Sequence, residues 1–432
     1  MSISEIERIR RPLHFTSMSA TGRSACKRIV VKIGTSSIIE QSDDGTTKLA
    51  LINLATIVDV LASLRGLGHD VVLVSSGAVG AGCHQLGITE RPDDMNLKKA
   101  LASIGQVHLM SKYEQLFTSL GYNCAQMLLT YENFVDRKQF VNAKNTFEQL
   151  FIYGIIPVVN ENDCVGVAEL KADNDKLACM VGNMIHADIV FLLTDVSGVF
   201  TANPNDDPSA RLIPVVRNIH ELKAACNLEG EDSAWGTGGI SAKVEAANLA
   251  STLGVRAVIM SADESSRIPS YLDTFDEEEY SFGTTFMPSE NPPGERKRWI
   301  KSLLRRGTIQ VTFECIENLT EKKNVKTQDI LSCKGDFSSM ESVRVMDPGG
   351  AVIGCGLSNF ASEQIDIIKG LKYNDISEDI QDMLGESRFV MRFENFAFYK
   401  DVEENVPPTP PTNDCISTAY SSTSLSSEVL SA

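Results

Sequence analysis

Four apolar runs of this chain each end in a short segment of small or polar residues. The runs are Arg28–Ile33, Val71–Val74, Ile155–Val159 and Ile189–Leu193, and valine and isoleucine dominate them. Continuous runs of β-branched residues, without polar alternation, are typical of strands that are buried on both faces of a sheet. The pattern therefore predicts a largely parallel sheet covered by helices on both sides.

Helical patterns alternate with these runs over residues 27 to 290, and they are Leu97–Phe117, Thr146–Tyr153, Lys176–His186 and Ser241–Leu253. Strands that alternate with helices form βαβ units and hence an α/β domain. A short run at Gly283–Phe286 is expected to close this domain. The fold class of the first domain is therefore α/β, with a mainly parallel sheet sandwiched by helices.

Polar side chains gather just after the buried run at 155–159. Asn160, Glu161, Asn162 and Asp163 follow it, and the segment Lys171–Asp175 comes about ten residues later. Ligands of α/β sheets bind at the carboxyl ends of the strands, so these residues predict a site for a small, charged molecule. Glycines in the turns at Gly34 and Gly77 let backbone amides approach an anion closely, and phosphate suits such a turn.

The overall composition excludes several functional classes. The chain has 432 residues, of which 43% are hydrophobic and 22% charged, and its 40 basic and 57 acidic residues give a net charge of −17. That balance argues against a protein built mainly to bind nucleic acid, and no apolar run is long enough to span a membrane. Ten cysteines occur singly, without the spacing of a zinc site, which suits a reduced compartment and a cytoplasmic location.

The remainder of the chain divides by composition. Residues 1–26 form an N-terminal extension that we expect to be disordered, residues 291–303 a linker and residues 403–432 a disordered tail rich in Pro, Ser and Thr. Between them, residues 304–402 contain short strand-like runs, at Gly307–Val311, Ile330–Cys333, Ser342–Gly350 and Phe389–Phe393. Short strands with Gly and Pro turns predict a small β-barrel. A basic cluster is interpreted as a solvated part of the linker, and it comprises Arg296, Lys297, Arg298, Lys301, Arg305 and Arg306.

Four motifs carry a resemblance to a known family: Val31–Ser36, Ser75–Ala78, Val159–Asp163 together with Asp173–Asp175, and Gly236–Lys243. On these motifs the chain resembles the amino acid kinase family, from about residue 27, and within it the members that phosphorylate the γ-carboxylate of glutamate. Residues 304–402 resemble the PUA domain that many bacterial members carry. That domain usually carries a glycine followed by an acid before one of its strands, whereas the segment Ser338–Glu341 of this chain keeps only the acid. We therefore do not expect RNA to be its partner.

The resemblance implies a catalytic group of two lysines and one aspartate. Lys32 and Lys243 correspond to the lysines that stabilise the transferred phosphoryl group, and Asp175 to the residue that pairs with both. A lysine inside an apolar strand is rarely structural, because burying its charge is costly. The family has a hydroxyl residue just before the second lysine, whereas this chain has Ala242.

The resemblance also implies the contacts of the two substrates. Those of L-glutamate are Ser76, Gly77, Asn160, Asp163, Lys171, Asp173 and Asn174. Those of the nucleotide are Lys32, Gly34, Thr194, Asp195, Thr237, Gly238, Gly239, Ile240, Ser241, Ala242 and Lys243. Asp163 and Asp173 also suit the role of helix caps, a purely structural reading. ATP would bring Mg²⁺ with it, since this ion binds mainly through phosphates. Proline would inhibit the phosphorylation of glutamate. The chain would form a homo-oligomer, and no contact with a membrane is expected.

Two alternatives remain open from the sequence. The same fold would accept a different substrate, such as aspartate, N-acetylglutamate or a nucleoside monophosphate. The chain would otherwise serve as an RNA-binding or scaffolding protein whose kinase domain is inactive. The acidic side chains near the predicted site suit the α-ammonium of free glutamate, so they favour glutamate over the other acceptors. The intact lysines and the acidic net charge argue against an RNA-binding or scaffolding protein.

Overall fold

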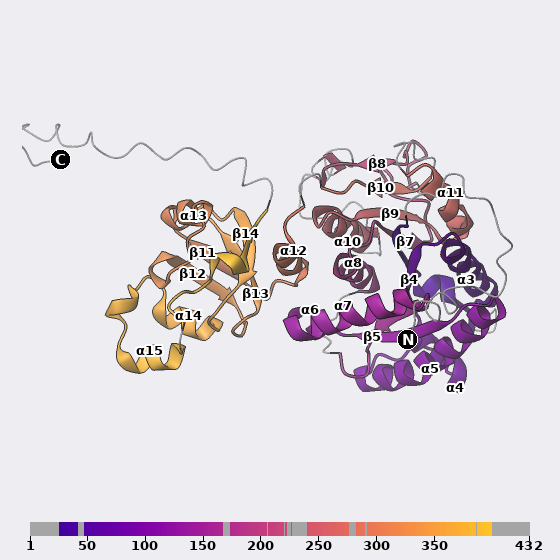
Figure 1. Ribbon diagram of the computed structural model, residues 1–432, viewed down its shortest axis with the longest axis horizontal. Helices are drawn as coiled ribbons and strands as arrows, with labels where there is room; N and C mark the ends of the chain where they lie inside the picture. The colour runs from indigo at the N-terminus through magenta and orange to yellow at the C-terminus, as the bar shows by residue number, and fades with distance from the viewer. Residues whose placement is uncertain are drawn as a thin grey trace, which may run out of the picture.

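The computed structural model describes residues 26–41, 47–166, 173–204, 206–219, 221–222, 226, 240–275, 282–289, 292–385 and 387–399. Figure 1 shows a large α/β unit and a smaller β-rich unit, with one helix between them. The predicted N-terminal extension, apart from Cys26, and the predicted C-terminal tail lie outside the described residues. Within these residues, no helix is both long and apolar enough to cross a membrane.

The large unit is built on one sheet with the strand order β5-β6-β4-β1-β7-β9-β10-β8. All neighbouring pairs run parallel except β9 and β10. Its strands are β1 (Arg28–Lys32), β4 (Asp70–Val74), β5 (Cys124–Leu129), β6 (Ile156–Glu161), β7 (Ile189–Thr194), β8 (Val215–Val216), β9 (Arg256–Ser261) and β10 (Thr284–Phe286). The predicted parallel sheet is therefore confirmed, and the run at Gly283–Phe286 does join it. A separate hairpin pairs β2 (Ile39–Gln41) with β3 (Thr47–Leu49).

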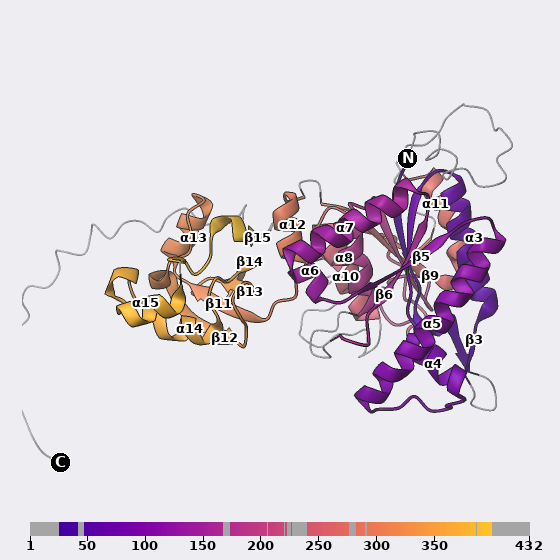
Figure 2. The ribbon, with the colours of Figure 1, turned by 60° about the horizontal axis from the view of Figure 1, so that its bottom comes forward.

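Helices cover both faces of the sheet, which explains why its strands lack polar alternation (Figure 2). One apolar core lies under α3 (Leu51–Gly66), α4 (Ala78–Leu86), α5 (Met95–Ser119) and α11 (Ile268–Asp273). The opposite core lies under α7 (Arg137–Ile152), α8 (Asn174–Met184) and α10 (Ile240–Thr252). Short elements complete the unit, namely α2 (Thr35–Ile38), α6 (Glu132–Val135) and the 3₁₀ helix η2 (Ala262–Arg267).

The four predicted helices are present, and each begins before its apolar pattern, α5 and α7 at capping aspartates. Helix α5 begins at Met95, because the carboxylate of Asp94 accepts a hydrogen bond from the backbone N–H of Leu97. Helix α7 begins at Arg137 for the same reason, with Asp136 as its cap. Aspartate at these positions satisfies donors that the first turn of a helix leaves unpaired. The caps therefore set these helix starts, and the apolar periodicity does not.

The small unit contains a five-stranded sheet with the order β12-β11-β13-β14-β15. Its strands are β11 (Gly307–Val311), β12 (Ile330–Gly335), β13 (Ser342–Met346), β14 (Val352–Leu357) and β15 (Phe396–Phe398). Around it lie α13 (Phe313–Thr320), α14 (Ser362–Ile368), α15 (Glu378–Leu384) and the 3₁₀ helices η3 (Thr327–Asp329), η4 (Tyr373–Asp375) and η5 (Phe393–Asn395).

One predicted strand of the small unit is wrong. Segment Phe389–Phe393 makes only an isolated bridge between Met391 and Val325, and the last strand is β15 instead. The residues of this segment still pack in the core, where Val390 and Met391 are buried. The apolar composition of this segment therefore predicted its burial correctly, but the predicted strand conformation is wrong.

Helix α12 (Glu295–Ser302) occupies most of the segment predicted to be a linker. Trp299 is 3% exposed, and its indole N–H donates to the carbonyl of Phe134. The hydroxyl of Tyr131 accepts a hydrogen bond from the backbone N–H of Leu304 at 2.6 Å. Trp299 and Ile300 belong to the same apolar core as Cys355 and Leu357 of β14. The basic cluster is therefore not a solvated linker, since its helix packs between the two units.

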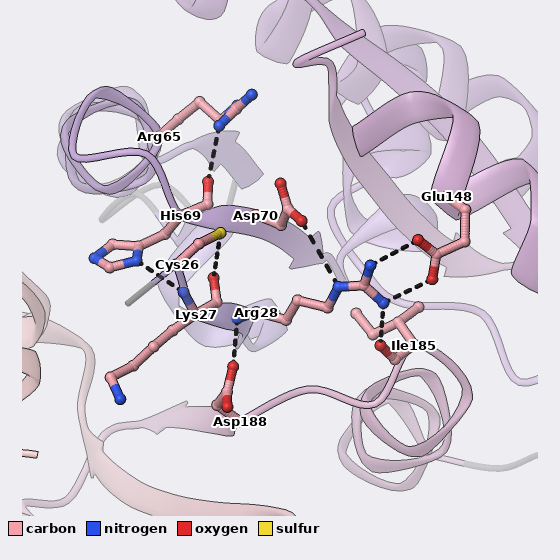
Figure 3. A network of polar contacts seen from close by, with 9 residues as sticks. All are labelled: Cys26, Lys27, Arg28, Arg65, His69, Asp70, Glu148, Ile185 and Asp188. Atoms are coloured by element: carbon pink, nitrogen blue, oxygen red, sulfur yellow. Dashed lines mark hydrogen bonds and ion pairs between the residues drawn. The ribbon is translucent and has the colours of Figure 1, made fainter. Parts of the chain in front are cut away.

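A polar network fixes the beginning of the central strand β1 (Figure 3). The guanidinium of Arg28 donates to both carboxylate oxygens of Glu148 at 2.6 Å and to the carbonyl of Ile185 at 2.7 Å. Its backbone N–H donates to Asp188 at 2.6 Å, and Asp70 lies 3.6 Å from its side chain. Arg28 thereby links the amino-terminal edge of the sheet to helix α7.

Candidate active site

The carboxyl ends of four strands meet along one edge of the sheet. Strands β6, β4, β1 and β7 are neighbours and run parallel, so the residues that follow them lie side by side. Lys32 ends β1, Thr194 ends β7, Ser75 and Ser76 follow β4, and Asn160 is the last but one residue of β6. The structure thus brings the residues of three sequence motifs together.

Asp175 lies between two lysine ammonium groups. The Nζ atom of Lys32 is 2.6 Å from one carboxylate oxygen of Asp175, and Nζ of Lys243 is 3.0 Å from the other. Both Lys32 and Asp175 have about 6% of their side-chain surface exposed, and Lys243 has 12%. Three separate elements supply the group, since Lys32 lies on β1, Asp175 in the first turn of α8 and Lys243 in the first turn of α10.

The surroundings of Lys32, Asp175 and Lys243 favour the binding of an anion. Burial is the largest cause that lowers the pKa of Lys32 below its ordinary value of 10.5; Asp175 opposes the shift, and Lys243 adds to it. The two ammonium groups and the one carboxylate of this trio sum to one formal positive charge, and the carboxylate of Asp173 also acts on Lys32. Burial in a site of low dielectric strengthens the attraction of that charge for a bound anion. The arrangement therefore suits a phosphoryl group that carries negative charge.

A chain of amide and hydroxyl groups lies beside the lysines. The side-chain N–H of Asn174 donates to Oγ of Ser76 at 2.7 Å and to Oδ1 of Asn160 at 3.5 Å. Asn160 is 2% exposed, and its own amide donates to Oε1 of Gln106 at 2.9 Å. These bonds fix which way each amide faces, so the polar atoms that remain are held in place for a ligand.

The turn after β4 is shaped by Gly77, which has a φ of +88° and precedes α4. A side chain at this left-handed φ is strained. Buried Ser75 hydrogen-bonds Tyr113 of α5 at 2.9 Å, which holds the turn from behind. Helices α4 and α5 approach so closely that a Cβ at Gly105 would lie 1.9 Å from the carbonyl oxygen of Ala78.

Gln106 and Tyr113 were not identified from the sequence as parts of the site. Both lie on the buried face of α5, and a polar residue on such a face is the one signal that could have indicated Gln106. A glutamine at an apolar helical position needs a hydrogen-bond partner, and Asn160 provides it.

The remaining predicted residues are placed as follows. Gly34 caps the short helix α2, and a Cβ on it would lie 3.8 Å from Nζ of Lys32. The hydroxyl of Thr194 donates to Asp195 at 2.9 Å at the end of β7. Three residues lie with Lys243 in the first turn of α10, namely Ile240, Ser241 and Ala242. Four predicted residues lie outside the described part of the chain, namely Lys171, Thr237, Gly238 and Gly239.

The two aspartates that suited helix caps differ from each other. Asp173 is exposed and caps α8, because Oδ1 accepts the backbone N–H groups of Asp175 and Lys176 at 2.9 Å. It thereby holds the turn that carries Asp175. Asp163 is half-buried in the turn after β6 and begins no helix. In the described ranges, no three His, Cys, Asp or Glu side chains are grouped as metal ligands would be.

The chain is similar to known proteins over most of its length. The pattern that describes the amino acid kinase family matches residues 27–261, and that of the PUA domain matches residues 307–380. A protein of Synechocystis sp. named glutamate 5-kinase is 40% identical over 360 residues, which cover 83% of this chain and 93% of the relative. A glutamate 5-kinase of Nostoc punctiforme is 42% identical over 354 residues, covering 81% and 94%. A solved carbamate kinase of Giardia lamblia bound to AMP-PNP is 17% identical and covers 61% of this chain and 99% of its own, with a TM-score of 0.46.

Proposed function

This chain belongs to the amino acid kinase family, and we propose that it transfers the γ-phosphoryl group of ATP to the γ-carboxylate of L-glutamate. The products are ADP and L-glutamyl 5-phosphate, an acyl phosphate, and by the resemblance this is the first step of proline synthesis. The observation that carries the proposal is the pair of ammonium groups, Lys32 and Lys243, held by one aspartate. Relatives named glutamate 5-kinase, about 40% identical over most of the chain, support the choice of substrate.

In the proposed mechanism the enzyme positions the reactants and neutralises charge. The γ-carboxylate of glutamate attacks the γ-phosphorus, and the bond to the β,γ-bridging oxygen breaks. Negative charge grows on that oxygen while it stays high on the peripheral oxygens, and Lys32 and Lys243 would stabilise both. Asp175 would keep the two ammonium groups at a fixed separation, so they need no reorganisation during the reaction. Mg²⁺ is proposed to arrive with ATP, bound through its phosphates.

Glutamate is proposed to bind along the amide and hydroxyl chain. Ser76 and the backbone amide of Gly77 would hold the α-carboxylate, while Asn160 and Asp163 would hold the α-ammonium. Asn174 contacts both Ser76 and Asn160, so it would align these two contacts. Lys171 and Asp173 are proposed to lie close to the bound substrate.

The nucleotide is proposed to lie across the opposite half of the same edge. Thr194 and Asp195 follow β7 and would contact the ribose or base. Ser241 and Lys243 lie in the first turn of α10, and the N-terminal turn of a helix attracts phosphate. Gly34 lies beside Lys32, and its lack of a side chain would let a phosphoryl group approach the backbone there.

The deciding experiment is a turnover assay on the purified chain with ATP, Mg²⁺ and L-glutamate. We expect ADP release that depends on glutamate, and an acyl phosphate that hydroxylamine converts to a hydroxamate. Aspartate, N-acetylglutamate and UMP serve as alternative acceptors in the same assay. If one of them supports turnover and glutamate does not, the substrate is wrong; if none does, the kinase itself is refuted.

The pH dependence of turnover should reflect Lys32. Its lowered pKa means that the proton is lost at a lower pH than from an ordinary lysine. Only the charged form neutralises phosphate, so kcat/KM for ATP should fall on the alkaline side with an apparent pKa below 10.5. The variant Lys32→Arg keeps its charge at all these pH values, and any activity it retains should decline at higher pH. An unchanged alkaline limb in this variant would assign the titration to another group.

Proline is proposed to inhibit by occupying the glutamate pocket. Its α-carboxylate and secondary ammonium match the groups that Ser76, Asn160 and Asp163 would hold, but it lacks a side-chain carboxylate. Inhibition should therefore be competitive with glutamate and should raise its apparent KM without changing kcat. Turnover that is insensitive to proline at limiting glutamate would contradict this proposal.

A further inference from the structure

A cavity of about 1410 Å³ lies between the two units, away from the candidate active site. Its walls come from α10 and from the residues after β8 and β10 on one side, and from α12 and β15 on the other. Among the described residues that line it, none is assigned above to catalysis, glutamate or the nucleotide. It exceeds the roughly 300–1,000 Å³ that is usual for small-molecule sites.

The strand register places this cavity at the opposite edge of the sheet. Strand β10 runs against β9, with Phe286 paired to Ala257, so the residues after Phe286 lie at the amino-terminal ends of the parallel strands. Arg217 follows β8, which runs parallel to β10, and lies at that same edge. Lys32 and Thr194 lie at the carboxyl edge. The cavity is therefore separate from the site proposed for ATP.

Five cationic side chains line the cavity against two acidic ones. The cations are Arg217, Arg296, Lys297, Lys301 and Arg305, and the acids are Glu245 and Glu295. Glu245 lies 3.1 Å from Lys176, and Glu295 lies 3.2 Å from Lys144 and 3.6 Å from Arg137. The hydrogen bond from Lys144 lowers the pKa of Glu295. All three of these partners lie outside the lining, so both acids are paired with cations that do not belong to the cavity wall.

Several of these cations have neutral partners. Arg305 donates to the carbonyls of Ile300 and Lys301 and to the hydroxyls of Ser342 and Tyr399. Arg296 donates to the amide oxygen of Asn395, and Lys297 lies over the ring of Phe393. Lys301, which is 6% exposed, lies 5.8 Å from the ring of Tyr399. In a chain with a net charge of −17, this concentration of positive charge is a local exception.

The rest of the lining is apolar. Ile219, Leu249, Met287, Pro288 and Phe398 contribute to the walls beside the cations. A ligand that fits both parts carries phosphate at one end and a flat, weakly polar group at the other. We propose that this cavity binds a nucleoside phosphate, with its phosphates on the cations of α12 and its base against the apolar wall. The hollow is partly open to solvent, and three of its five cations lie together on α12, which suits the phosphates of a single nucleotide.

Binding there would involve the helix that carries Lys243. Helix α10 has Lys243 in its first turn and Ser251 and Thr252 in the cavity wall, about 14 Å further along at 1.5 Å per residue. Glu245 lines the cavity and also pairs with Lys176 of α8, the helix of Asp175. The cavity and the candidate active site therefore share two helices.

The test is a calorimetric titration of ADP with Mg²⁺ into the full chain. We expect a second binding event beyond the one at the kinase site. The variant Arg296→Gln/Lys297→Gln should weaken the second event at least tenfold and leave the first unchanged. The control Lys334→Gln/Arg344→Gln removes the same charge from exposed positions of the small unit and should keep both events. Lys301→Met provides an independent variant within the cavity, with thermal melting as the check on folding.

The outcomes separate this inference from the proposed function. Loss of the first event alone in Lys243→Ala is the expected result for the kinase site, whereas a second event that survives both cavity variants overturns the inference. A single event in the wild-type chain overturns it too. Tripolyphosphate that binds the cavity as tightly as ADP would exclude a role for the base. A short RNA that binds there while ADP does not would replace the nucleotide with RNA.

Discussion

Replacing Lys243 with alanine is expected to lower kcat by about 10²–10³-fold and to change the KM for glutamate by less than about threefold. The ammonium group lies where charge develops on the transferred phosphoryl group, so its contribution is largest in the transition state. Glutamate is proposed to bind along Ser76, Asn160 and Asp163, which this substitution does not touch. Steady-state kinetics with ATP and glutamate varied separately will measure both constants.

Lys176→Ala is the matched control for this substitution. Lys176 lies next to Asp175 on the same helix, but its side chain is 31% exposed and pairs with Glu245. Removing it deletes the same type of side chain near the site, and we expect kcat to change by less than about twofold, as for a surface ion pair. If Lys243→Ala folds normally and keeps the wild-type kcat, Lys243 has no part in the transition state.

Replacing Asp175 with asparagine is expected to impair both stability and turnover. Without the carboxylate, the ammonium groups of Lys32 and Lys243 face each other in a buried site without compensation. Removing one partner of a buried ion pair costs about 3–5 kcal/mol. We expect a loss of that size in the free energy of unfolding measured in urea, and a fall in kcat of at least about 10²-fold because the lysines are no longer aligned.

Two further variants separate these effects. Asp59→Asn removes an exposed carboxylate from α3 and should change stability by less than about 0.5 kcal/mol. The double variant Asp175→Asn/Lys32→Met removes one of the two buried cations, so its loss of stability should be smaller than the sum of the two single losses. Turnover should stay low in the double variant. Additive losses of stability would show that the contact of 2.6 Å carries little interaction energy.

The convergence of the site was predictable because it follows from strand direction. Lys32, Ser76 and Asn160 each come at the end of a buried apolar run, and in a parallel sheet such ends share one edge. Lys243 and Asp175 required more than a pattern, since their contact depends on how α8 and α10 pack on the sheet. The motifs supplied that pairing through the family resemblance. Apolar periodicity alone does not contain it.

The supporting contacts were not predictable for a physical reason. Gln106 reaches Asn160, and Tyr113 reaches Ser75, only because Gly105 lets α5 approach α4 closely. That approach joins residues whose local sequence carries no shared signal. Helix α12 was missed for a related reason, because its arginines and lysines indicate exposure until Trp299 is seen to be buried.

The position of β1 has a consequence for how the chain is made. This strand lies in the middle of the sheet, and its neighbour β7 follows it much later in the sequence. Arg28 and Asp188, which are hydrogen-bonded, are 160 residues apart in the sequence. At about 5–20 residues per second, synthesis leaves one side of the strand unpaired for roughly 8–32 s. During that interval the nascent chain exposes an unpaired, strongly apolar strand edge, a feature that favours association with other chains.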